Sequence, residues 1–465
     1  MSDWKEFFKG KKVTQLGLGL LGRGLNDAIF LSKNVDELIV TDNKSADALK
    51  ESVDTVIKES PNPENINFVL GEHRKKDFCN RDFILKGAGV PLDSEYVAEA
   101  NKCGVPVYMD ESLFFLLKPE GTKFIGVTGT RGKTTTSMML QYILSNFLKN
   151  KSNVYLGGNI RGVATLPMLE KVKSEDVVVA ELSSWQLQGF GDTKMSPSIS
   201  IFTNLFEDHL NYYGGDMQSY FDDKSLIFKN QTKGDLLVVS EQADESIRKY
   251  FKNIEEIKSS YVVVDINKYS EILESLKIPG EHNKQNASLA ISVAKHMGVD
   301  DEAIKDSLSS FNGAEGRMEL IHQSDELEIY NDSTSTTPEA LIVAVKTLSE
   351  IAKKRKNRLI LIFGGADKEL DFTEALSVLK EKVDLIITIP GSGTDKITPI
   401  FEQNEIEVVS VDNLSKSVYM AKNKLNKGDI LLFSPGFASF GEFVNEFDRN
   451  DQFNNICSKI FAKNT

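Results

Sequence analysis

Residues 124–135 read Phe-Ile-Gly-Val-Thr-Gly-Thr-Arg-Gly-Lys-Thr-Thr, and this stretch decides the fold expected for the chain. The apolar run at 124–128 predicts a buried strand, and the glycines after it predict a loop. Apolar side chains then recur at helical spacing, at Leu140, Ile143, Leu144 and Phe147. A strand, a glycine loop and a helix in this order indicate a βα unit of a parallel sheet.

The same loop has the chemistry of a phosphate-binding site. Backbone N–H groups around Gly129 and Gly132 can surround phosphate oxygens, and Lys133 supplies a cation for the β- and γ-phosphates. The hydroxyl of Thr134 can bind Mg²⁺. The strict spacing of this motif would place a glycine at position 127, where the chain has Val127. The strand-loop-helix context nevertheless predicts a nucleoside-triphosphate site.

Acidic residues follow two further apolar runs. Val177-Val-Val-Ala-Glu181 predicts a buried strand that ends in a carboxylate, and parallel sheets bind ligands at that end. Asp208 and His209 follow the strand predicted at 199–202. Oxygen ligands with one imidazole suit Mg²⁺ or Mn²⁺, whereas a chain with only five histidines is not expected to hold a zinc cluster.

A second glycine loop lies near the start of the chain. Gly17-Leu-Gly19-Leu-Leu-Gly22 follows the apolar run 13–16, and Asp42 lies twenty residues further on, at the end of the next predicted strand. This pattern is typical of a pyrophosphate bound at a helix N-terminus with an acidic residue on the ribose. It fits NAD, as in a dehydrogenase, and equally a UDP-sugar. Glycines that only make a tight turn remain the simpler alternative.

The pattern of strand, glycine and helix recurs along the whole chain and predicts an α/β fold with mostly parallel sheets. The expected strands are residues 13–16, 38–41, 124–128, 177–180, 199–202, 327–330, 359–363, 385–389 and 430–433. Breaks occur at Lys118-Pro-Glu-Gly121 and at Asn312-Gly-Ala-Glu-Gly316. Because 465 residues are too many for one hydrophobic core, we expect three domains, at 1–118, 119–313 and 314–465.

The overall composition restricts location and partners. A net charge of −13 argues against nucleic acid or a membrane surface as the main partner. Charges in the first eight residues do not fit a signal peptide, and no run of 18 uncharged apolar residues occurs, so a cytoplasmic protein is expected. Cys79, Cys103 and Cys457 are far apart in sequence and are expected to be reduced thiols.

Taken together, the motifs resemble those of the Mur ligase family, and the resemblance extends over essentially the whole chain. The evidence is their order: the early glycine loop, the loop at 128–135, Glu-Leu-Ser-Ser-Trp-Gln-Leu at 181–187, Asp208-His209, Lys224, Gly-Glu-His-Asn at 280–283 with Asn286, Gly-Arg at 316–317, Asn-Asp-Ser at 331–333, Gly-Gly-Ala-Asp-Lys at 364–368, and Ser-Pro-Gly-Phe-Ala-Ser-Phe at 434–440.

The resemblance implies an ATP-dependent amide ligase of peptidoglycan precursor synthesis, with an acyl-phosphate intermediate. It implies a Rossmann-like domain that binds the UDP-sugar, a central domain that binds ATP and Mg²⁺, and a Rossmann-like C-terminal domain that brings the amino acid. Details such as Lys86-Gly-Ala-Gly-Val-Pro91 resemble the member that adds D-glutamate to UDP-N-acetylmuramoyl-L-alanine. A monomer is expected.

The resemblance also implies roles for individual residues. The catalytic group comprises Lys133, Glu181, His209 and Lys224, with two Mg²⁺ ions held by Thr134, Glu181, His209 and a carbamate on Lys224. ATP is expected to contact Gly129, Thr130, Gly132, Lys133, Thr134, Thr135, Asn283, Asn286, Arg317 and Asp332. The UDP-sugar is expected at Gly17, Gly19, Leu20, Leu21, Asp42 and Gly87, and D-glutamate at Thr336, Lys368, Ser439 and Phe440.

Three positions depart from the family pattern, namely Arg131 in the loop, Thr334 in place of a lysine and Glu446 in place of an aromatic residue. These departures leave open another Mur ligase with a different amino acid. A folylpolyglutamate synthetase shares the ATP domain but not the N-terminal domain. A dehydrogenase would leave the loop at 128–135, Glu181 and Lys224 without a role. A silent nucleotide-binding regulator would not be expected to retain these residues.

Overall fold

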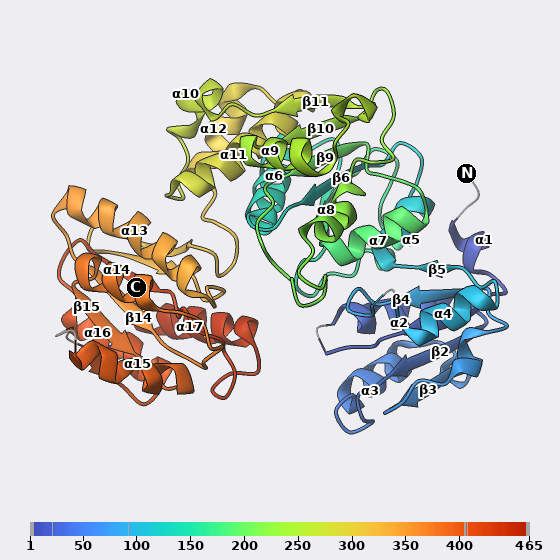
Figure 1. Ribbon diagram of the computed structural model, residues 1–465, viewed down its shortest axis with the longest axis horizontal. Coiled ribbons are helices and arrows are strands. Elements are labelled where there is room, and N and C mark those ends of the chain that lie inside the picture. The colour runs from blue at the N-terminus through green and yellow to red at the C-terminus, as the bar shows by residue number, and fades with distance from the viewer. Residues whose placement is uncertain (1–3, 21, 92, 404–405, 407, 462–465) are drawn as a thin grey trace. The chain divides into compact units, whose positions relative to one another are not determined.

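The computed structural model describes residues 4–20, 22–91, 93–403, 406 and 408–461. The chain forms two compact units, one with residues up to Glu274 and Gln285–Ser307, the other with Ser275–Lys284 and Leu308 onward. Three sheets are present in these residues, two in the first unit and one in the second (Figure 1). Within the described residues, no helix is long and apolar enough to cross a membrane.

The first sheet is entirely parallel, in the order β3-β2-β1-β4-β5. Its strands are β1 (Lys12–Leu16), β2 (Glu37–Asp42), β3 (Ile66–Leu70), β4 (Phe83–Lys86) and β5 (Val107–Tyr108). The helices are α1 (Trp4–Phe8), α2 (Arg23–Asn34), α3 (Lys50–Glu59), α4 (Glu95–Lys102) and α5 (Asp110–Leu117), with short 3₁₀ turns η1 (Pro63–Asn65) and η2 (Lys75–Phe78). Neighbouring β1 and β4 leave the glycine loop and residue 87 at one sheet edge.

The central sheet is also parallel, in the order β11-β10-β9-β6-β8-β7. Its strands are β6 (Lys123–Thr128), β7 (Val154–Gly158), β8 (Val177–Glu181), β9 (Ile199–Phe202), β10 (Leu236–Val239) and β11 (Ser260–Val263). Its helices are α6 (Lys133–Leu148), α7 (Ser184–Asp192), α8 (Met217–Ser225), α9 (Glu241–Tyr250), α10 (Ser270–Leu273), α11 (Glu281–His296) and α12 (Asp301–Ser310). Short 3₁₀ turns are η3 (Leu166–Glu170), η4 (Ile254–Glu256) and η5 (Ile266–Tyr269).

The sheet of the second unit has the order β12-β13-β17-β14-β15-β16, and only its edge strand β12 is antiparallel. The strands are β12 (Glu319–Gln323), β13 (Leu327–Asn331), β14 (Leu359–Phe363), β15 (Leu385–Thr388), β16 (Val408–Ser410) and β17 (Asp429–Phe433). The helices are α13 (Pro338–Arg355), α14 (Thr373–Lys382), α15 (Ser392–Gln403), α16 (Leu414–Lys424) and α17 (Glu446–Phe461).

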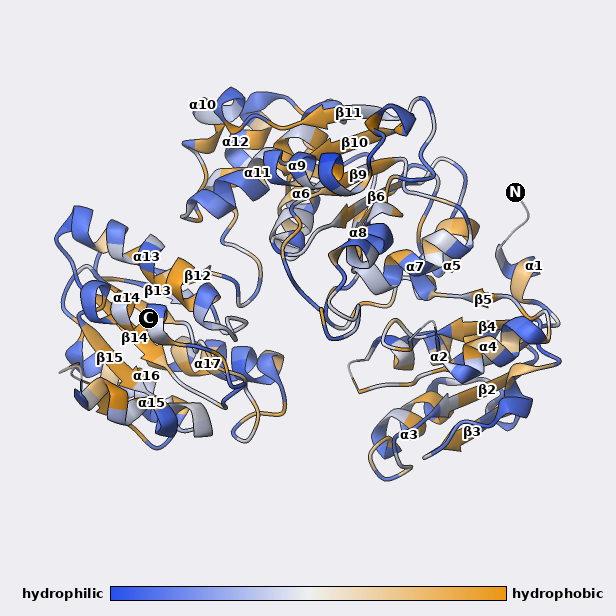
Figure 2. Cartoon of the chain, viewed as in Figure 1, coloured by the Kyte–Doolittle hydropathy of each residue, from blue (hydrophilic) through white to orange (hydrophobic). Residues whose placement is uncertain are grey.

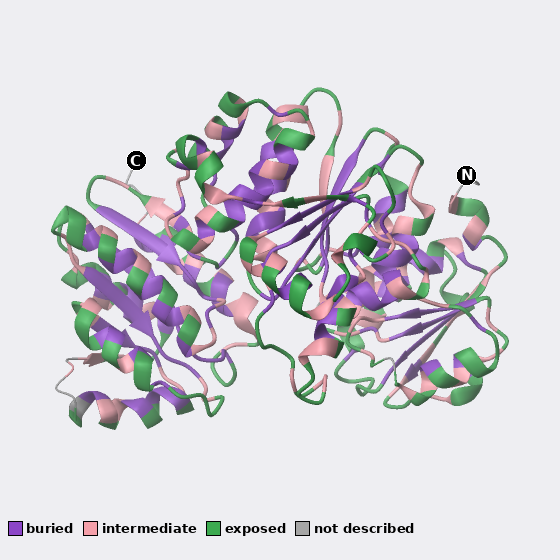
Figure 3. Cartoon of the chain, turned by 45° about the horizontal axis from the view of Figure 1, so that its top comes forward, coloured by how far each residue is buried: buried purple, intermediate pink, exposed green. Residues whose placement is uncertain are grey.

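Alternating side chains explain why helices cover both faces of this last sheet. Leu361 and Leu432 point into a cluster with α13, α14 and α15, while Ile362 and Leu431 point into another with α16 and α17. Strands buried on both faces must be continuously apolar, as β14 is. Figure 2 shows such strands as hydrophobic and the helices as mixed, and Figure 3 shows the strands buried.

The α/β fold class is confirmed, and each strand expected from the sequence is present within about one residue. The antiparallel β12 was not anticipated. The three-domain boundaries remain a prediction, because the contacts divide the chain into two units. Helix α6 has Leu140, Ile143 and Leu144 buried on its inner face, as its spacing predicts.

The expectation of three reduced cysteines is wrong for two of them. Cys79, which follows η2, and Cys103, which follows α4, form a disulfide with Cα atoms 5.5 Å apart, whereas Cys457 is free and buried. The pair is 24 residues apart in sequence, and only the packing of α4 beside η2 brings the two together. Sequence spacing carries no signal for such a contact.

Candidate functional site

The loop between β6 and α6 has a backbone that only glycine accommodates at two positions. Gly129 has φ +142°, and a Cβ there would lie 1.9 Å from Thr203 Oγ1. Gly132 has φ +79°, and a Cβ there would lie 2.3 Å from Asn286 Oδ1. The loop therefore winds tightly against β9 and α11, so the predicted contact residue Asn286 does lie beside it.

Thr134, in the first turn of α6, meets Glu181 at the end of β8. Thr134 Oγ1 donates a 2.6 Å hydrogen bond to Glu181 Oε2, and Asn159 Nδ2 donates a 3.2 Å bond to Oε1. Glu181 is 2% exposed. The group presents hard oxygen donors at the N-terminus of α6, which is the donor set that Mg²⁺ prefers. The residues thus fit the ion that the sequence predicts.

Two lysines lie at the same loop. Lys133 Nζ donates to Thr130 O at 2.9 Å, and Lys224 Nζ donates to Gly129 O at 2.8 Å. Lys224 is buried and lies over the ring of Tyr220, with Nζ 4.7 Å from its centroid. Burial first, and then the neighbouring charge of Lys133, hold the pKa of Lys224 well below its usual value. A lysine in this position is more easily deprotonated than one in water.

The remaining loop residues are also fixed by contacts. Thr130 Oγ1 accepts from Phe206 N at 2.9 Å and lies 3.3 Å from Tyr220 Oη, while Thr135 is buried. Arg131, one of the departures, is exposed, and its backbone N–H donates to Asn204 Oδ1 at 2.8 Å. The departure therefore changes a surface side chain and leaves the loop backbone anchored.

His209 lies on an exposed turn, with a left-handed backbone at φ +53°. Its ring centroid is 4.9 Å from that of Trp185, and its Nε2 is 3.7 Å from Asp208 Oδ2. Trp185 belongs to α7, which starts directly after the Glu181 segment. The strained backbone of a non-glycine residue is often a mark of a functional position.

In the N-terminal glycine loop, Asp42 is hydrogen-bonded to backbone amides of the loop itself. Asp42 Oδ2 accepts hydrogen bonds of 2.9 Å from the amides of Leu18 and Gly19, and Oδ1 accepts from Lys44 N at 2.9 Å. Burial would raise the pKa of Asp42, but these amide bonds outweigh it and the pKa is lowered. The carboxylate therefore orders the loop itself.

The other predicted residues of this region take varied positions. Gly17 donates its N–H to Thr41 O at 2.8 Å, Gly87 donates its N–H to Leu16 O at 2.9 Å, and the side chain of Leu20 is exposed. The prediction for Leu21 lies outside the described residues. Adjacent strands β1 and β4 place Gly17 and Gly87 at one edge of the sheet.

The second unit holds another group of predicted residues at the carboxyl ends of β13, β17 and β14. Asp332 is buried, and its carboxylate accepts from Met318 N at 3.1 Å and from Ser434 Oγ at 2.9 Å. Burial raises its pKa to about 7, although both hydrogen bonds and the exposed Arg317 oppose the rise.

The residues predicted for the amino acid lie at the same edge. Lys368 Nζ, which is exposed, donates to Thr336 Oγ1 at 3.2 Å. Ala366 and Ala438 form an isolated antiparallel β-bridge, a pair of backbone hydrogen bonds. This pairing brings the loop of Lys368 next to Ser439 and Phe440. Ser439 is buried and Phe440 is 64% exposed. A cation, two hydroxyls and an apolar ring thus occur together.

Helix α11 carries two residues predicted to contact ATP, Asn283 and Asn286, and their surroundings differ. Asn283 is buried, and its Nδ2 donates to Pro279 O at 2.7 Å, whereas Asn286 lies against Gly132. Asn283 belongs to the second unit and Asn286 to the first. The direct bond of Asn283 is therefore to its own helix-entry segment.

Sequence reasoning missed two further residues. Asn159 follows Gly157 and Gly158, the last two residues of β7, and that glycine pair after an apolar run was the available signal. Arg449 is fully buried in α17, where it donates to Ser333 O at 2.8 Å and Phe437 O at 3.0 Å. Burial of an arginine is not visible in the sequence.

The two other departures from the family pattern, Thr334 and Glu446, have contacts within their own surroundings. Thr334 Oγ1 donates to Gly316 O at 2.8 Å, and Glu446 begins α17.

Two family models match the chain, the Mur ligase middle domain over residues 127–292 and the glutamate ligase domain of Mur ligases over residues 316–437. The UDP-N-acetylmuramoylalanine–D-glutamate ligase of Borreliella burgdorferi is 35% identical over 466 residues, which cover 96% of this chain and 97% of that protein. The enzyme of the same name from Roseiflexus is 30% identical, with 97% and 99% covered. The crystal structure of the MurF ligase of Thermotoga maritima in complex with ADP has a similar fold, with a TM-score of 0.56, 17% identity and 100% of both chains covered. The chain belongs to the Mur ligase family.

Proposed function

We propose that the chain joins D-glutamate to UDP-N-acetylmuramoyl-L-alanine in an ATP-dependent reaction that makes a precursor of peptidoglycan. Relatives that carry the name of this activity match at 30–35% identity over nearly the full chain. The observation that carries the proposal is the convergence of Thr134, Glu181 and Lys224 on the loop at 128–135.

In the first step, the carboxylate of the alanyl group attacks the γ-phosphorus of ATP and ADP leaves. In the second step, the amine of D-glutamate attacks the carbonyl of the acyl phosphate and phosphate leaves. Both steps bring negative charges together, so cations and N–H donors dominate the site. Lys133 and the loop amides hold the β- and γ-phosphates, together with Asn286 beside Gly132.

Two Mg²⁺ ions complete the proposed site, since the oxygens of Thr134 and Glu181 suit one and His209 is the candidate ligand for the other. When bound, they neutralise charge on the phosphates and on the attacking carboxylate. The chain's own residues orient these ligands: Asn159 and Thr134 each hold one oxygen of Glu181. ATP also contacts Thr130, Thr135, Asn283, Arg317 and Asp332 in this proposal.

The glycine loop at 17–22, with Leu20, Leu21, Asp42 and Gly87, is the proposed site for the UDP-sugar. The amides of Leu18 and Gly19 are already bonded to Asp42, so this carboxylate acts by shaping the loop. Thr336, Lys368, Ser439 and Phe440 are the proposed D-glutamate site, where the Lys368 cation suits a carboxylate. Three domains, at 1–118, 119–313 and 314–465, are proposed to divide these tasks in a cytoplasmic monomer.

A test of the overall function is phosphate release with ATP, Mg²⁺ and UDP-N-acetylmuramoyl-L-alanine across a panel of amino acids. Release with D-glutamate, with the amide product confirmed by mass, is the expected result. Release only with a different amino acid would overturn the proposed substrate and keep the ligase chemistry. Thr334 would then be a first position to examine.

Lys224 is proposed to carry a carbamate. Its burial, its low pKa and its place at Gly129 O support this, because only a neutral amine reacts with CO₂. Replacement by alanine (Lys224→Ala) should nearly abolish activity, and a small carboxylic acid such as formate should restore part of it. Lys229→Ala is the matched control, since Lys229 is exposed just beyond the same helix. Full activity of Lys224→Ala would contradict the proposal.

A further inference from the structure

An arginine bridges the two sheets of the first unit at the glycine loop. Arg23 is the first residue of α2, directly after Gly22, so its backbone is continuous with the loop. Its Nη2 donates to Gly158 O at 3.0 Å and to Asn159 Oδ1 at 3.3 Å, and its Nε donates to Val163 O at 3.4 Å. The three acceptors belong to the last residue of β7 and to the segment that follows it.

The end of β7 and the residues after it contact Glu181, the last residue of β8. Asn159 Nδ2 donates to Glu181 Oε1 at 3.2 Å, and Asn159 N donates to Glu181 O at 2.7 Å. Gly158 lies against the same residue, since a Cβ there would be 1.9 Å from Glu181 O. Glu181 Oε2 in turn accepts from Thr134. A continuous set of hydrogen bonds therefore runs from Arg23 through Asn159 and Glu181 to the first turn of α6.

Buried carboxyl groups lie beside the guanidinium, which is charged at any ordinary pH, and burial raises the pKa of two of them, Asp27 and Glu111, well above the usual range. Arg23 Nη1 lies 3.8 Å from Glu111 Oε1, and Asp27 and Asp110 are also buried nearby. Burial alone would lower the pKa of Arg23, but these carboxyl groups more than offset it and the pKa is raised. Glu111 also accepts from Gln186 of α7, so its position is tied to the central sheet. Arginine is suited to this place because its planar fork makes several bonds at once.

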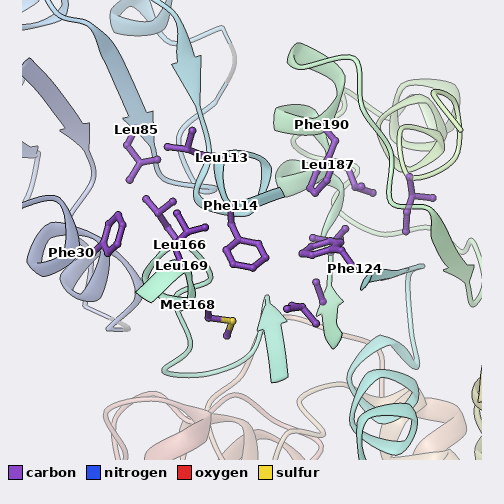
Figure 4. Close-up of a cluster of buried hydrophobic side chains, with 14 of the residues drawn as sticks. Phe30, Leu85, Leu113, Phe114, Phe124, Leu166, Met168, Leu169, Leu187 and Phe190 are labelled. Atoms are coloured by element: carbon purple, nitrogen blue, oxygen red, sulfur yellow. The ribbon is translucent and has the colours of Figure 1, made fainter. Parts of the chain in front are cut away.

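Apolar packing also holds the two sheets of the first unit together. An apolar cluster already joins them: Figure 4 shows Phe30, Leu85, Leu113 and Phe114 of the N-terminal part next to Leu166, Met168 and Leu169 of the central part. Partly buried ion pairs contribute little net stability compared with such packing. The polar chain from Arg23 to Glu181 therefore acts on orientation rather than on cohesion.

We propose that Arg23 is a positioning residue that couples the glycine loop at 17–22 to Glu181, so that ligand at the UDP-sugar loop and Mg²⁺·ADP at the loop at 128–135 strengthen each other's binding. The inference rests on the proposed function for the identity of the two ligands. A ligand that fixes the first loop fixes Arg23, and with it the orientation of Asn159 and Glu181. By thermodynamic linkage, the UDP-sugar tightens Mg²⁺·ADP binding by the same factor by which Mg²⁺·ADP tightens binding of the UDP-sugar.

The test measures the affinity for Mg²⁺·ADP by calorimetry with and without saturating UDP-N-acetylmuramoyl-L-alanine. It needs no turnover and no D-glutamate, so it is independent of whether the amino-acid assignment is right. In the wild type the UDP-sugar should tighten Mg²⁺·ADP binding by about 5-fold or more. In Arg23→Met this factor should fall to about 1, with Mg²⁺·ADP affinity in the absence of UDP-sugar changed by less than about 3-fold.

Two further variants separate coupling from folding. Arg23→Lys keeps the charge but reaches fewer acceptors, so its coupling factor should lie between those of the wild type and Arg23→Met. Arg81→Met is the matched control, because Arg81 is a mostly buried arginine just before β4 that pairs with Glu37, and it should keep wild-type coupling. The proposal would be overturned if Arg23→Met kept the wild-type coupling factor, or if the wild type itself showed no coupling. It would also be overturned if Arg81→Met lost as much coupling as Arg23→Met. Failure of phosphate release with D-glutamate would instead count against the proposed function alone.

Discussion

The hydroxyl of Thr134 and the carboxylate of Glu181 form a 2.6 Å hydrogen bond although 47 residues separate them in the sequence. The register of the central sheet explains the contact. Val127 pairs with Glu181 across β6 and β8, and Gly158 pairs with Glu181 across β8 and β7. Glu181 thus ends the strand between the loop at 128–135 and the turn that carries Asn159.

Gly158→Ala should displace Glu181. Gly158 has φ +76°, and a Cβ there would lie 1.9 Å from Glu181 O, so the strand end or the turn must shift. We expect affinity for Mg²⁺·ADP to fall by about 10-fold or more, as when a residue supporting a metal ligand is lost. Gly162→Ala is the control, because Gly162 has a similar φ of +68° but nothing within 4 Å. That variant should lose only about 1 kcal/mol of stability. Equal affinities in the two variants would contradict the role of Gly158.

Lys368→Met should weaken the use of D-glutamate selectively. Lys368 Nζ bonds Thr336 Oγ1 at the strand ends and supplies the cation proposed for a carboxylate. Loss of a charged hydrogen bond predicts a KM for D-glutamate raised by about 10-fold or more, with the KM for ATP little changed. Lys396→Met is the control, since exposed Lys396 pairs with Asp367, one residue before Lys368. Steady-state kinetics with each substrate varied in turn would check this. If Lys368 acted only through folding, the activity would fall to the same extent whichever substrate was varied.

Asp332 should make stability depend on pH in a defined direction. Burial raises its pKa to about 7 from an ordinary value of 3.8, so the folded chain retains a proton that the unfolded chain has released. Stability from this group is therefore present at low pH and is lost as pH rises from about 4 to about 7. Urea unfolding at pH 5 and pH 8 should show a decline in the wild type that is smaller in Asp332→Asn. Asp367→Asn, at a carboxyl whose pKa is lowered mainly by Lys396, should keep the wild-type decline.

The disulfide between Cys79 and Cys103 should stabilise the N-terminal part. A closed segment of this size contributes about 3 kcal/mol by restricting the unfolded chain. Thermal unfolding of the oxidised wild type should shift to lower temperature on addition of a reductant, and the double variant Cys79→Ser/Cys103→Ser should not respond. An unchanged wild-type transition under reductant would show that the bond adds no stability.

The sequence by itself determined the elements and their order. Strands such as 359–363 are continuously apolar because both faces are covered, and that pattern is local. The loop at 128–135 was also recognisable, since glycine, lysine and threonine types at fixed spacing follow from the backbone and charge that a phosphate requires. Glu181 could be expected at a strand end because it directly follows the apolar run 177–180.

The tertiary structure alone decided which of these groups touch. Asn159 reaches Glu181, Arg23 reaches Asn159, and Cys79 reaches Cys103 only after strands pair and helices pack. The hydrogen bonds of Asp42 to the loop amides follow from where β2 ends beside that loop. The physical reason is that periodicity and spacing report each residue's own environment. Contacts between distant residues depend on sheet register and side-chain direction, which are set by packing of the whole unit.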